Sequence, residues 1–411
     1  MAVIDINKQN GAVSKPGTDT VTTVLIVGAG STGLALAQGL KMAGIPYVVY
    51  EKRPSLDSGL RDWNMGLHWG APALMGLLSE ESCARIQSVQ VDASAPTAEN
   101  DVVPILNAQS GEQLLAVPVQ KFYRLRRSKL RALLAEGVDI RYGKKLQDIT
   151  YSEDGRTATA YFEDGTSASA RLIIGADGAR STLRKLLIGP ERGSLSPQMA
   201  PAVPGRHQSI GSLWLLWAAG RARPISARDM DVFFYISWPS SLEEQDATAG
   251  WTNAQRLKQL KSFAKNFSDP WRSACEWIED DDYPVWYMGL SDFDPGADGH
   301  RWDNHGGRVT LAGDAAHAMT YQRGQGLNHA MVDAANLVDA IKSFAFIPED
   351  SKESQSLQKE AISAYEEETI ERSGAEVRLS TTNTQMLHNW EQVLQSPAFT
   401  MGIKRTQTEV H

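Results

Sequence analysis

Residues 24–40, VLIVGAGSTGLALAQGL, decide the fold of this chain. The first four residues are apolar and mostly β-branched, which predicts a buried strand, and the leucines that follow recur at helical spacing. Between strand and helix stand Gly28, Gly30 and Gly33. In such a turn the first glycine permits the tight bend, the second lets the backbone approach a pyrophosphate, and the third lets the helix pack on the strand. The free N–H groups at the start of the helix would face the phosphates.

A second strand completes a β-α-β unit of about 30 residues. It is predicted at Tyr47–Tyr50, YVVY, and is followed by Glu51. A carboxylate about 20 residues after the glycines is placed to accept hydrogen bonds from the ribose hydroxyls of a dinucleotide. The unit therefore predicts dinucleotide binding, with a purely structural turn as the alternative, and it does not decide between NAD and FAD.

Composition places the chain among folded proteins. Of its 411 residues, 42% are hydrophobic and 22% are charged, close to globular averages, and the length suggests two domains. There are 41 Lys and Arg against 49 Asp and Glu, without a dense basic block, so nucleic acid is not an expected partner. Cys83 and Cys275 stand far apart and outside any metal-ligand spacing, so we expect neither a disulfide framework nor a metal site.

The N-terminal residues and the most apolar segment bear on location. Residues 1–20 are polar and lack the basic start and apolar stretch of a signal peptide, so they are predicted to form a flexible tail. The most apolar later segment, Leu213–Gly220, is much shorter than the roughly 18 residues of a membrane span. We expect a cytoplasmic protein without an integral membrane segment.

Apolar periodicity predicts the remaining elements. They are helices at 128–135, 325–344 and 357–387, and strands at 139–142, 158–162, 172–174, 213–218, 231–238 and 308–312. The tight-turn triplets Glu153–Gly155 and Glu163–Gly165 flank one of these strands, which indicates an antiparallel meander.

Two further motifs follow predicted strands. One is GADGARSTLR at 175–184, and the other is GDAAH at 313–317, which leads into GQGLN at 324–328. With the glycine turn, they resemble the FAD-dependent aromatic hydroxylases of the p-hydroxybenzoate hydroxylase fold, the single-component group A flavoprotein monooxygenases. The resemblance extends over roughly residues 21–387. Two stretches, RDWNMGLHW at 61–69 and RGQGLNH around the last motif, are similar to fungal secondary-metabolite members.

The resemblance implies an α/β fold with a Rossmann-like FAD-binding domain, an inserted, mostly antiparallel β substrate domain and a C-terminal helix. The FAD-binding domain would be discontinuous, from residues 21–190 and 291–390, with 58–122 contributing in part to the substrate pocket. Aromatic apolar runs, preceded by a segment rich in Pro, Gly and Ser, place the β-rich substrate domain at 191–290. Residues 391–411 are expected to form a C-terminal tail.

The same resemblance assigns FAD contacts to the last motif. Asp314 would accept hydrogen bonds from the ribityl hydroxyls, although an aspartate that only caps a turn is the alternative. Gly324 and Gly326, with the glutamine between them, would turn their backbone N–H groups toward the flavin pyrimidine edge. Leu327 and Asn328 would lie beside the isoalloxazine through backbone contacts.

Two more FAD contacts follow from the resemblance. Arg127 matches the arginine that opens a helix and reaches the FAD phosphates or ribose, although arginines on either side compete for this role. A solvated basic helix face is the alternative. Asp177 is similar to the residue that supports the FAD pyrophosphate and nicotinamide access, with a turn aspartate as the alternative.

By resemblance, NADPH or NADH reduces FAD, O₂ adds to form a C4a-hydroperoxyflavin, and the distal oxygen passes to an aromatic or indole-type metabolite of alkaloid or polyketide character. The outcome would be a hydroxylation or an epoxidation in secondary-metabolite biosynthesis. Activating such a ring calls for a base or a hydrogen-bonding pair above the flavin. The catalytic candidates are His68, Tyr235 and Arg206, with a structural histidine and an aromatic core residue as alternatives for the first two.

One departure keeps other reactions open. The family commonly has proline four residues after the histidine of GDAAH, where this chain has Tyr321. Baeyer–Villiger oxygenation beside a carbonyl and dehydrogenation on the same fold therefore stay open. A non-catalytic escort protein is opposed by the intact Asp314, Gly324 and Gly326. The zinc protease and α/β-hydrolase patterns, H-E-x-x-H and G-x-S-x-G, are absent.

Overall fold

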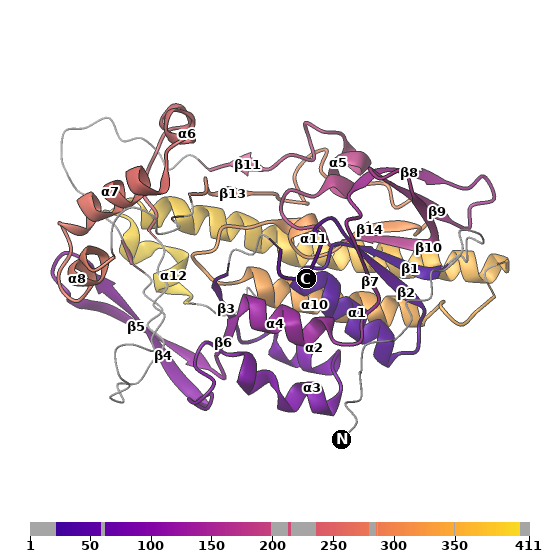
Figure 1. The fold of residues 1–411 in the computed structure, drawn as a ribbon, viewed down its shortest axis with the longest axis horizontal. Coiled ribbons are helices and arrows are strands. Elements are labelled where there is room, and N and C mark those ends of the chain that lie inside the picture. Colours follow the sequence, from indigo (N-terminus) through magenta and orange to yellow (C-terminus); the bar gives the residue numbers. More distant parts are fainter. Residues whose placement is uncertain are drawn as a thin grey trace, which may run out of the picture.

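The computed structural model describes residues 22–58, 62–198, 213–214, 236–278, 285, 287–348 and 350–402. Within these residues, the largest sheet has seven strands in the order β7-β2-β1-β10-β9-β8, with β14 also paired to β10. Their bounds are β1 (Thr22–Val27), β2 (Tyr47–Glu51), β7 (Ile140–Tyr142), β8 (Leu146–Tyr151), β9 (Ala158–Phe162), β10 (Ser167–Gly175) and β14 (Val309–Leu311). The pairs of β1 with β2, β2 with β7, β1 with β10 and β10 with β14 are parallel, whereas β8, β9 and the start of β10 form the expected antiparallel meander. The carboxyl ends of β1, β10 and β14 are therefore neighbours. These strands lie in the right half of Figure 1.

Helices pack on this sheet and extend beyond it (Figure 1). Their bounds are α1 (Ser31–Met42), α2 (Ala71–Gly76), α3 (Glu80–Ala84), η1 (Ile86–Val89), α4 (Arg127–Ala135), α5 (Thr182–Ile188), α6 (Leu242–Thr248), α7 (Asn253–Ala264), α8 (Trp271–Glu276), α9 (Asp314–His317), α10 (Gly326–Lys342), α11 (Lys352–Leu387), η2 (Val393–Gln395) and α12 (Pro397–Thr400). Local sequence sets several starts. Thr252 and Gln255 form a capping box before α7, and Ser351 caps α11 by accepting from the N–H of Ser354.

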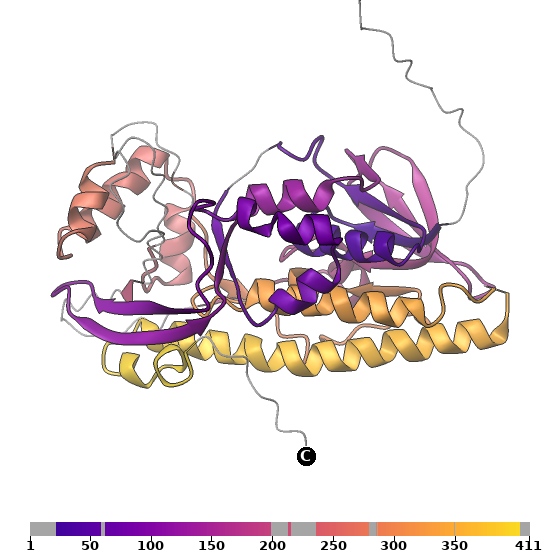
Figure 2. The same ribbon diagram turned by 90° about the horizontal axis from the view of Figure 1, so that it is seen from below.

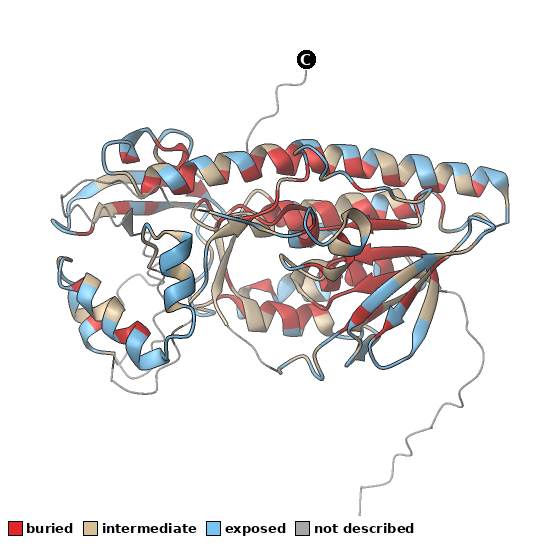
Figure 3. Ribbon diagram, turned by 90° about the horizontal axis from the view of Figure 1, so that it is seen from above, coloured by how far each residue is buried: buried red, intermediate tan, exposed pale blue. Residues whose placement is uncertain are grey.

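Both faces of the parallel part of the sheet are covered, which is why the last four residues of β1, Val24–Val27, are all apolar. Val24 and Ile26 belong to a core that includes residues of α1 and α10. Leu25 and Val27 belong to a second core, which includes residues of the meander, α5 and α9. Figure 3 shows the buried residues concentrated in the sheet and in the helices against it. The expected α/β class with a parallel core is confirmed.

Three smaller sheets are described. They are β12 (Leu213–Trp214) with β4 (Asn100–Asn107) and β5 (Gln113–Gln120), β3 (Asn64–Leu67) with β6 (Tyr123–Arg126), and β11 (Ser196–Pro197) with β13 (Ser291–Asp292). The β4–β5 hairpin projects on the left of Figure 1, close to α8. The N–H and hydroxyl of Ser268, between α7 and α8, both donate to the carbonyl oxygen of Ala108 at the hairpin turn, at 2.7 and 3.1 Å.

A β-rich domain is expected at 191–290. In the described part of this range, helices α6, α7 and α8 are the longest elements, and the strands β11 and β12 have only two residues each. The strands expected at 213–218 and 231–238 lie largely outside the described residues, so the β-rich domain stays a prediction. Helix α7 forms because Leu257, Leu260 and Ala264 recur at three- and four-residue spacing on its inner side. The neighbouring aromatic runs drew the prediction toward strands.

The two ends of the chain have different outcomes. The expected tail at 391–411 is corrected in its described part, because η2 and α12 fold there with Val393 and Ala398 buried. Packing of these two apolar side chains against Leu387 supplies the physical reason. The expected tail at 1–20 lies outside the described residues.

Helix α11 has 36 residues, which corresponds to a length of about 54 Å. In Figure 2 it runs below α10 along the long axis, from the side of the large sheet to the side of the β4–β5 hairpin. It confirms the expected C-terminal helix. None of the helices in the described ranges has both the length and the apolar character needed to cross a membrane.

Candidate active site

The glycine turn between β1 and α1 is held by backbone contacts that leave no room for side chains. Gly28 has a φ of +110°, and a Cβ there would lie 2.5 Å from the carbonyl oxygen of Ala176. A Cβ on Gly33 would lie 2.1 Å from the carbonyl oxygen of Gly28. On Gly30 a Cβ would have its nearest neighbour at 3.8 Å, so this part of the turn is open. The first and third glycines thus serve packing, and the second leaves space for a ligand.

Glu51 and Arg131 hold the glycine turn from two sides. Oε2 of Glu51 accepts from the N–H of Ala29 at 2.8 Å, and Oε1 accepts from the N–H of Arg53 at 2.9 Å. The buried guanidinium of Arg131 donates from Nε and Nη2 to the carbonyl oxygen of Ala29, at 3.1 and 3.0 Å, and from Nη1 to that of Leu56 at 3.2 Å. Arg131 is thereby committed to the backbone of the turn.

Arg127 opens α4, and its guanidinium lies over the ring of Trp63, 4.4 Å from the centroid. Burial, and then the charges of Arg131 and Arg53, lower the pKa of Arg127 to about 10. Burial and Arg53 also lower the pKa of Arg131. Guanidinium groups that repel one another beside the glycine turn favour a bound polyanion.

The GADGARSTLR motif links the end of β10 to α5. The carboxylate of Asp177 accepts from the N–H of Thr182 at 2.6 Å and from the hydroxyl of Ser181 at 2.5 Å. It therefore caps α5. Burial raises the pKa of Asp177.

Arg184, to which the sequence assigned no role, is buried and donates to the carbonyl oxygens of Ala179 and Ala315, at 2.5 and 2.8 Å. It therefore joins the second motif to the third.

Asp314 stands at the start of α9, directly beyond β14. Its side chain is exposed, yet desolvation by the surrounding protein raises its pKa despite the nearby charges of His317 and Arg184. A ligand can thus reach this carboxyl, whose charged form the surrounding protein disfavours. A Cβ on Gly326 would lie 4.0 Å from its Oδ1, so GDAAH and GQGLN meet at this point.

The loop of residues 318–328 is fixed by the side chain of Asn328. Its Oδ1 accepts from the N–H groups of His68 and Gly70, at 2.9 and 3.0 Å, and its Nδ2 donates to the carbonyl oxygen of Gly324 at 3.1 Å. This amide therefore ties the loop to the segment after β3. The predicted backbone contact of Asn328 with a ligand is compatible with this use of its side chain.

Two neighbours of Asn328 also turn their side chains into the protein. Leu327 is half-buried and packs against the core that includes residues of α1 and α10. Gln325 is buried, and its Oε1 accepts from the indole N–H of Trp69 at 2.7 Å. The side chains of Leu327 and Gln325 thus anchor the loop to the protein.

Asp333, on α10, organises the GDAAH turn from behind. Its buried carboxylate accepts from the N–H of Gly313 at 2.7 Å, from Nε2 of His317 at 2.6 Å and from Nη2 of Arg372 at 2.7 Å. Burial alone would raise the pKa of Asp333, but His317 and Arg372 hold it below its usual range. The sequence analysis missed this residue. The available signal was an acidic residue on the alanine-rich, inward face of a predicted helix.

His68 is the one catalytic candidate that the described residues include. It follows β3 and stacks on Phe122, with 5.6 Å between ring centroids. Its Nε2 is buried and has no hydrogen-bond partner within the described ranges. Burial and the charge of Arg323 lower the pKa of His68 to about 4, so the imidazole is neutral near pH 7. Tyr235 and Arg206 lie outside the described residues.

Comparison with known proteins decides the family. Residues 21–350 match the family described as FAD binding domain. Over 410 residues the chain is 35% identical to the FAD-dependent monooxygenase cctM of Talaromyces islandicus, covering 95% of this chain and 99% of that protein. The chain belongs to this family of FAD-dependent monooxygenases.

Two more comparisons extend the match. The FAD-dependent monooxygenase phnB of Penicillium herquei is 32% identical over 94% of this chain and 96% of that protein. HpxO of Klebsiella pneumoniae, solved with FAD and uric acid, superposes with a TM-score of 0.66 over 95% of this monooxygenase and 94% of that chain. At 19% identity, HpxO shows the fold alone. The resemblance stated from the sequence motifs is confirmed by the two fungal relatives.

The residues of this monooxygenase fit its cofactor FAD. Space remains where side chains on Gly30 and Gly326 would project, and Asp314 is accessible beside the second of these. Arg127 adds positive charge next to the glycine turn, where the pyrophosphate is expected. Within the described ranges, no three His, Cys, Asp or Glu side chains are grouped so that they could hold a metal ion.

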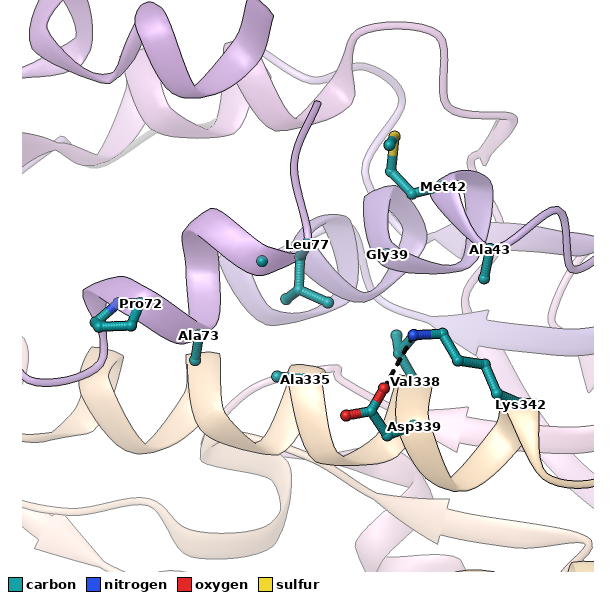
Figure 4. Close-up of a pocket in the computed structure, with 11 residues that line it drawn as sticks. Gly39, Met42, Ala43, Pro72, Ala73, Leu77, Ala335, Val338, Asp339 and Lys342 are labelled. Carbon is teal, nitrogen blue, oxygen red and sulfur yellow. Dashed lines mark hydrogen bonds and ion pairs between the residues drawn. The ribbon is translucent and has the colours of Figure 1, made fainter. Parts of the chain in front are cut away.

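A groove of about 330 Å³ lies outside this site, between α1, α2 and α10 (Figure 4). Met42 and Leu77 line it, and Lys342 and Asp339 form an ion pair of 2.9 Å at its edge. Because Met42 ends α1 and the glycine turn precedes this helix, the groove and the FAD site lie at opposite ends of α1.

Proposed function

We propose that this enzyme uses NADPH or NADH to hydroxylate or epoxidise an aromatic or indole-type small molecule in secondary-metabolite biosynthesis. The observation that carries the proposal is the convergence of three motif turns at one edge of the sheet. Val27, Gly175 and Leu311 end parallel neighbouring strands in matched register, and each is followed by one of the motifs. Ligands of open parallel sheets bind outside such carboxyl ends.

Three parts of FAD would meet three parts of this edge. The glycine turn, with Gly28, Gly30, Gly33 and Glu51, would hold the adenosine and pyrophosphate, with Arg127 as a counter-charge. Asp314 would accept from the ribityl hydroxyls, and the backbone of Gly324, Gly326, Leu327 and Asn328 would face the flavin ring. Asp177 would support the pyrophosphate region through the helix start that it caps. Bound FAD would supply the electron transfer and the activation of O₂.

Two neutral polar groups near the 318–328 loop would contact the substrate. His68 is neutral near pH 7, so its unpaired Nε2 can exchange a hydrogen bond with a substrate hydroxyl or ring N–H. Burial raises the pKa of Tyr321, which hydrogen-bonds to Ser237, so this phenol also stays neutral. Both residues would orient an electron-rich ring. Tyr235 and Arg206 remain further candidates for the same role.

A substrate screen tests the proposal. Purified protein with FAD is mixed with NADPH or NADH and with phenols, indoles and polyketide-like aromatics, and pyridine nucleotide oxidation is followed. We expect one class to stimulate oxidation and to gain roughly 16 Da by mass spectrometry, as in oxygen insertion. Product NMR separates ring hydroxylation from insertion beside a carbonyl. Protein that takes up no FAD, or products that only lose hydrogen, would contradict the proposal.

A further inference from the structure

Helix α11 carries polar residues at a spacing of four along its C-terminal half. They are Arg372, Glu376, Ser380 and Thr384, all buried, followed by His388 as the C-cap. Each step of four residues advances about 40° around a helix, so these residues form a stripe that winds slowly along one side. Buried polar groups destabilise a protein unless they find partners. The partners of this stripe are therefore informative.

The first two residues of the stripe hold the GDAAH turn, through Asp333, and the residue before the GQGLN motif. Arg372 donates to Asp333, the residue that also holds the N–H of Gly313 and the ring of His317. Glu376 forms a fully buried ion pair with Arg323, directly before the GQGLN motif. The hydroxyl of Ser380 donates to the same carboxylate at 3.0 Å.

The middle of the stripe holds the centre of the 318–328 loop. The hydroxyl of Thr384 lies 2.7 Å from that of Thr320 and 2.9 Å from Oε1 of Gln322, and can donate to either oxygen. The hydroxyl of Thr320 donates to the carbonyl oxygen of Ser380 at 3.0 Å. Three consecutive turns of α11 therefore contact the segment from Thr320 to Arg323.

The stripe ends at His388, which contacts Ser237. Nδ1 of His388 lies 2.7 Å from the carbonyl oxygen of Thr384, so this nitrogen carries the hydrogen. Nε2, 3.0 Å from the hydroxyl of Ser237, then accepts in the neutral ring, which burial favours by lowering the pKa of His388. Ser237 also hydrogen-bonds to Tyr321. The same helix thus holds the loop and the start of the described segment that follows residue 235.

We propose that the stripe of α11 is the positioning device of the active site, which sets the 318–328 loop against the flavin and ties Ser237 to the same frame. Its members are positioning residues, because they act through the loop. This inference rests on the proposed placement of FAD along the loop. α11 begins after residue 350, where the match to the FAD binding domain ends. Figure 2 shows that α11 extends from the side of the large sheet to the side of the β4–β5 hairpin.

Glu376→Gln tests the inference in the FAD-loaded protein. Removing the charge frees Arg323 to shift the loop, so we expect an altered visible circular dichroism of the bound flavin and an FAD dissociation constant raised about tenfold. Glu376→Asp should restore much of the native signal. The matched control is Glu367→Gln, on the same helix, where the carboxylate is exposed and pairs with Arg301.

Two substitutions that each remove one hydroxyl group test the inference even if Glu376→Gln does not fold. Thr384→Val and Ser380→Ala should speed amide hydrogen exchange of residues 318–325 about fivefold, while exchange in the meander stays unchanged. Native exchange in both variants, or equal spectral changes in Glu376→Gln and Glu367→Gln, would overturn the inference. Wild-type protein that binds no FAD would instead contradict the proposed function.

Discussion

The glycine turn and the 318–328 loop meet at the same edge of the sheet, but they are held in different ways. The turn is fixed by the absence of side chains on Gly28 and Gly33 and by backbone contacts of Glu51. The loop is fixed by buried polar side chains from α10 and α11, among them the amide of Asn328 and the carboxylate of Glu376. Short-range steric fit leaves a motif in the sequence, whereas long-range polar anchoring does not.

The largest expected effect separates packing from ligand contact within the glycine turn. Gly33→Ala places a methyl group 2.1 Å from a backbone oxygen, so we expect a loss of at least about 3 kcal/mol in the free energy of unfolding of the FAD-free protein. Gly30→Ala meets nothing closer than 3.8 Å and should leave this stability unchanged while it weakens FAD binding.

Urea unfolding of the FAD-free protein and fluorescence titration with FAD measure the two effects separately. If both variants lost stability equally, the division of roles among the glycines would be wrong. If Gly30→Ala bound FAD as the native protein does, the open part of the turn would not be the pyrophosphate site.

The two regions also show what the sequence could predict. Apolar runs and glycine spacing are local properties of the sequence. They predicted the β-α-β unit, the order of the three motifs, and the strand β14, which lies far along the chain from the rest of the sheet. The roles of Asp333 and Arg323 were not predicted, because they depend on contacts with α11, which lies far along the chain. Their burial as paired charges is a tertiary property that no short motif records.

In the inserted range, the helices at 242–276 were not predicted. Capping boxes before α6 and α7 and the apolar spacing of α7 were present in the sequence. Asp177 was assigned to the cofactor, and its carboxylate caps α5 as well. Arg131, which could not be separated from Arg127 by position, proved to hold the turn itself.

A smaller effect is the pH dependence of the free energy of unfolding that arises from His68. The folded protein holds the pKa of His68 at about 4, below the ordinary 6.5, so only the unfolded chain takes up a proton between these values. His68 therefore lowers the free energy of unfolding as the pH falls below 6.5, by up to about 3 kcal/mol near pH 4. His68→Phe keeps the ring against Phe122 but cannot titrate. Urea unfolding at pH 7 and pH 5 should show a weaker pH dependence in this variant, and an unchanged dependence would refute the assignment.

The most direct test of the account is the FAD dissociation constant of Asp314→Ala. The carboxyl is exposed in the FAD-free protein, so its loss should leave the unfolding temperature unchanged, whereas a lost charge-assisted hydrogen bond weakens binding by about 2 kcal/mol. Asp339→Ala, an exposed aspartate beside the groove at the far end of α1, is the control. The account predicts a dissociation constant raised at least about tenfold in Asp314→Ala and unchanged in the control. Native affinity in Asp314→Ala would contradict the placement of FAD at this edge of the sheet.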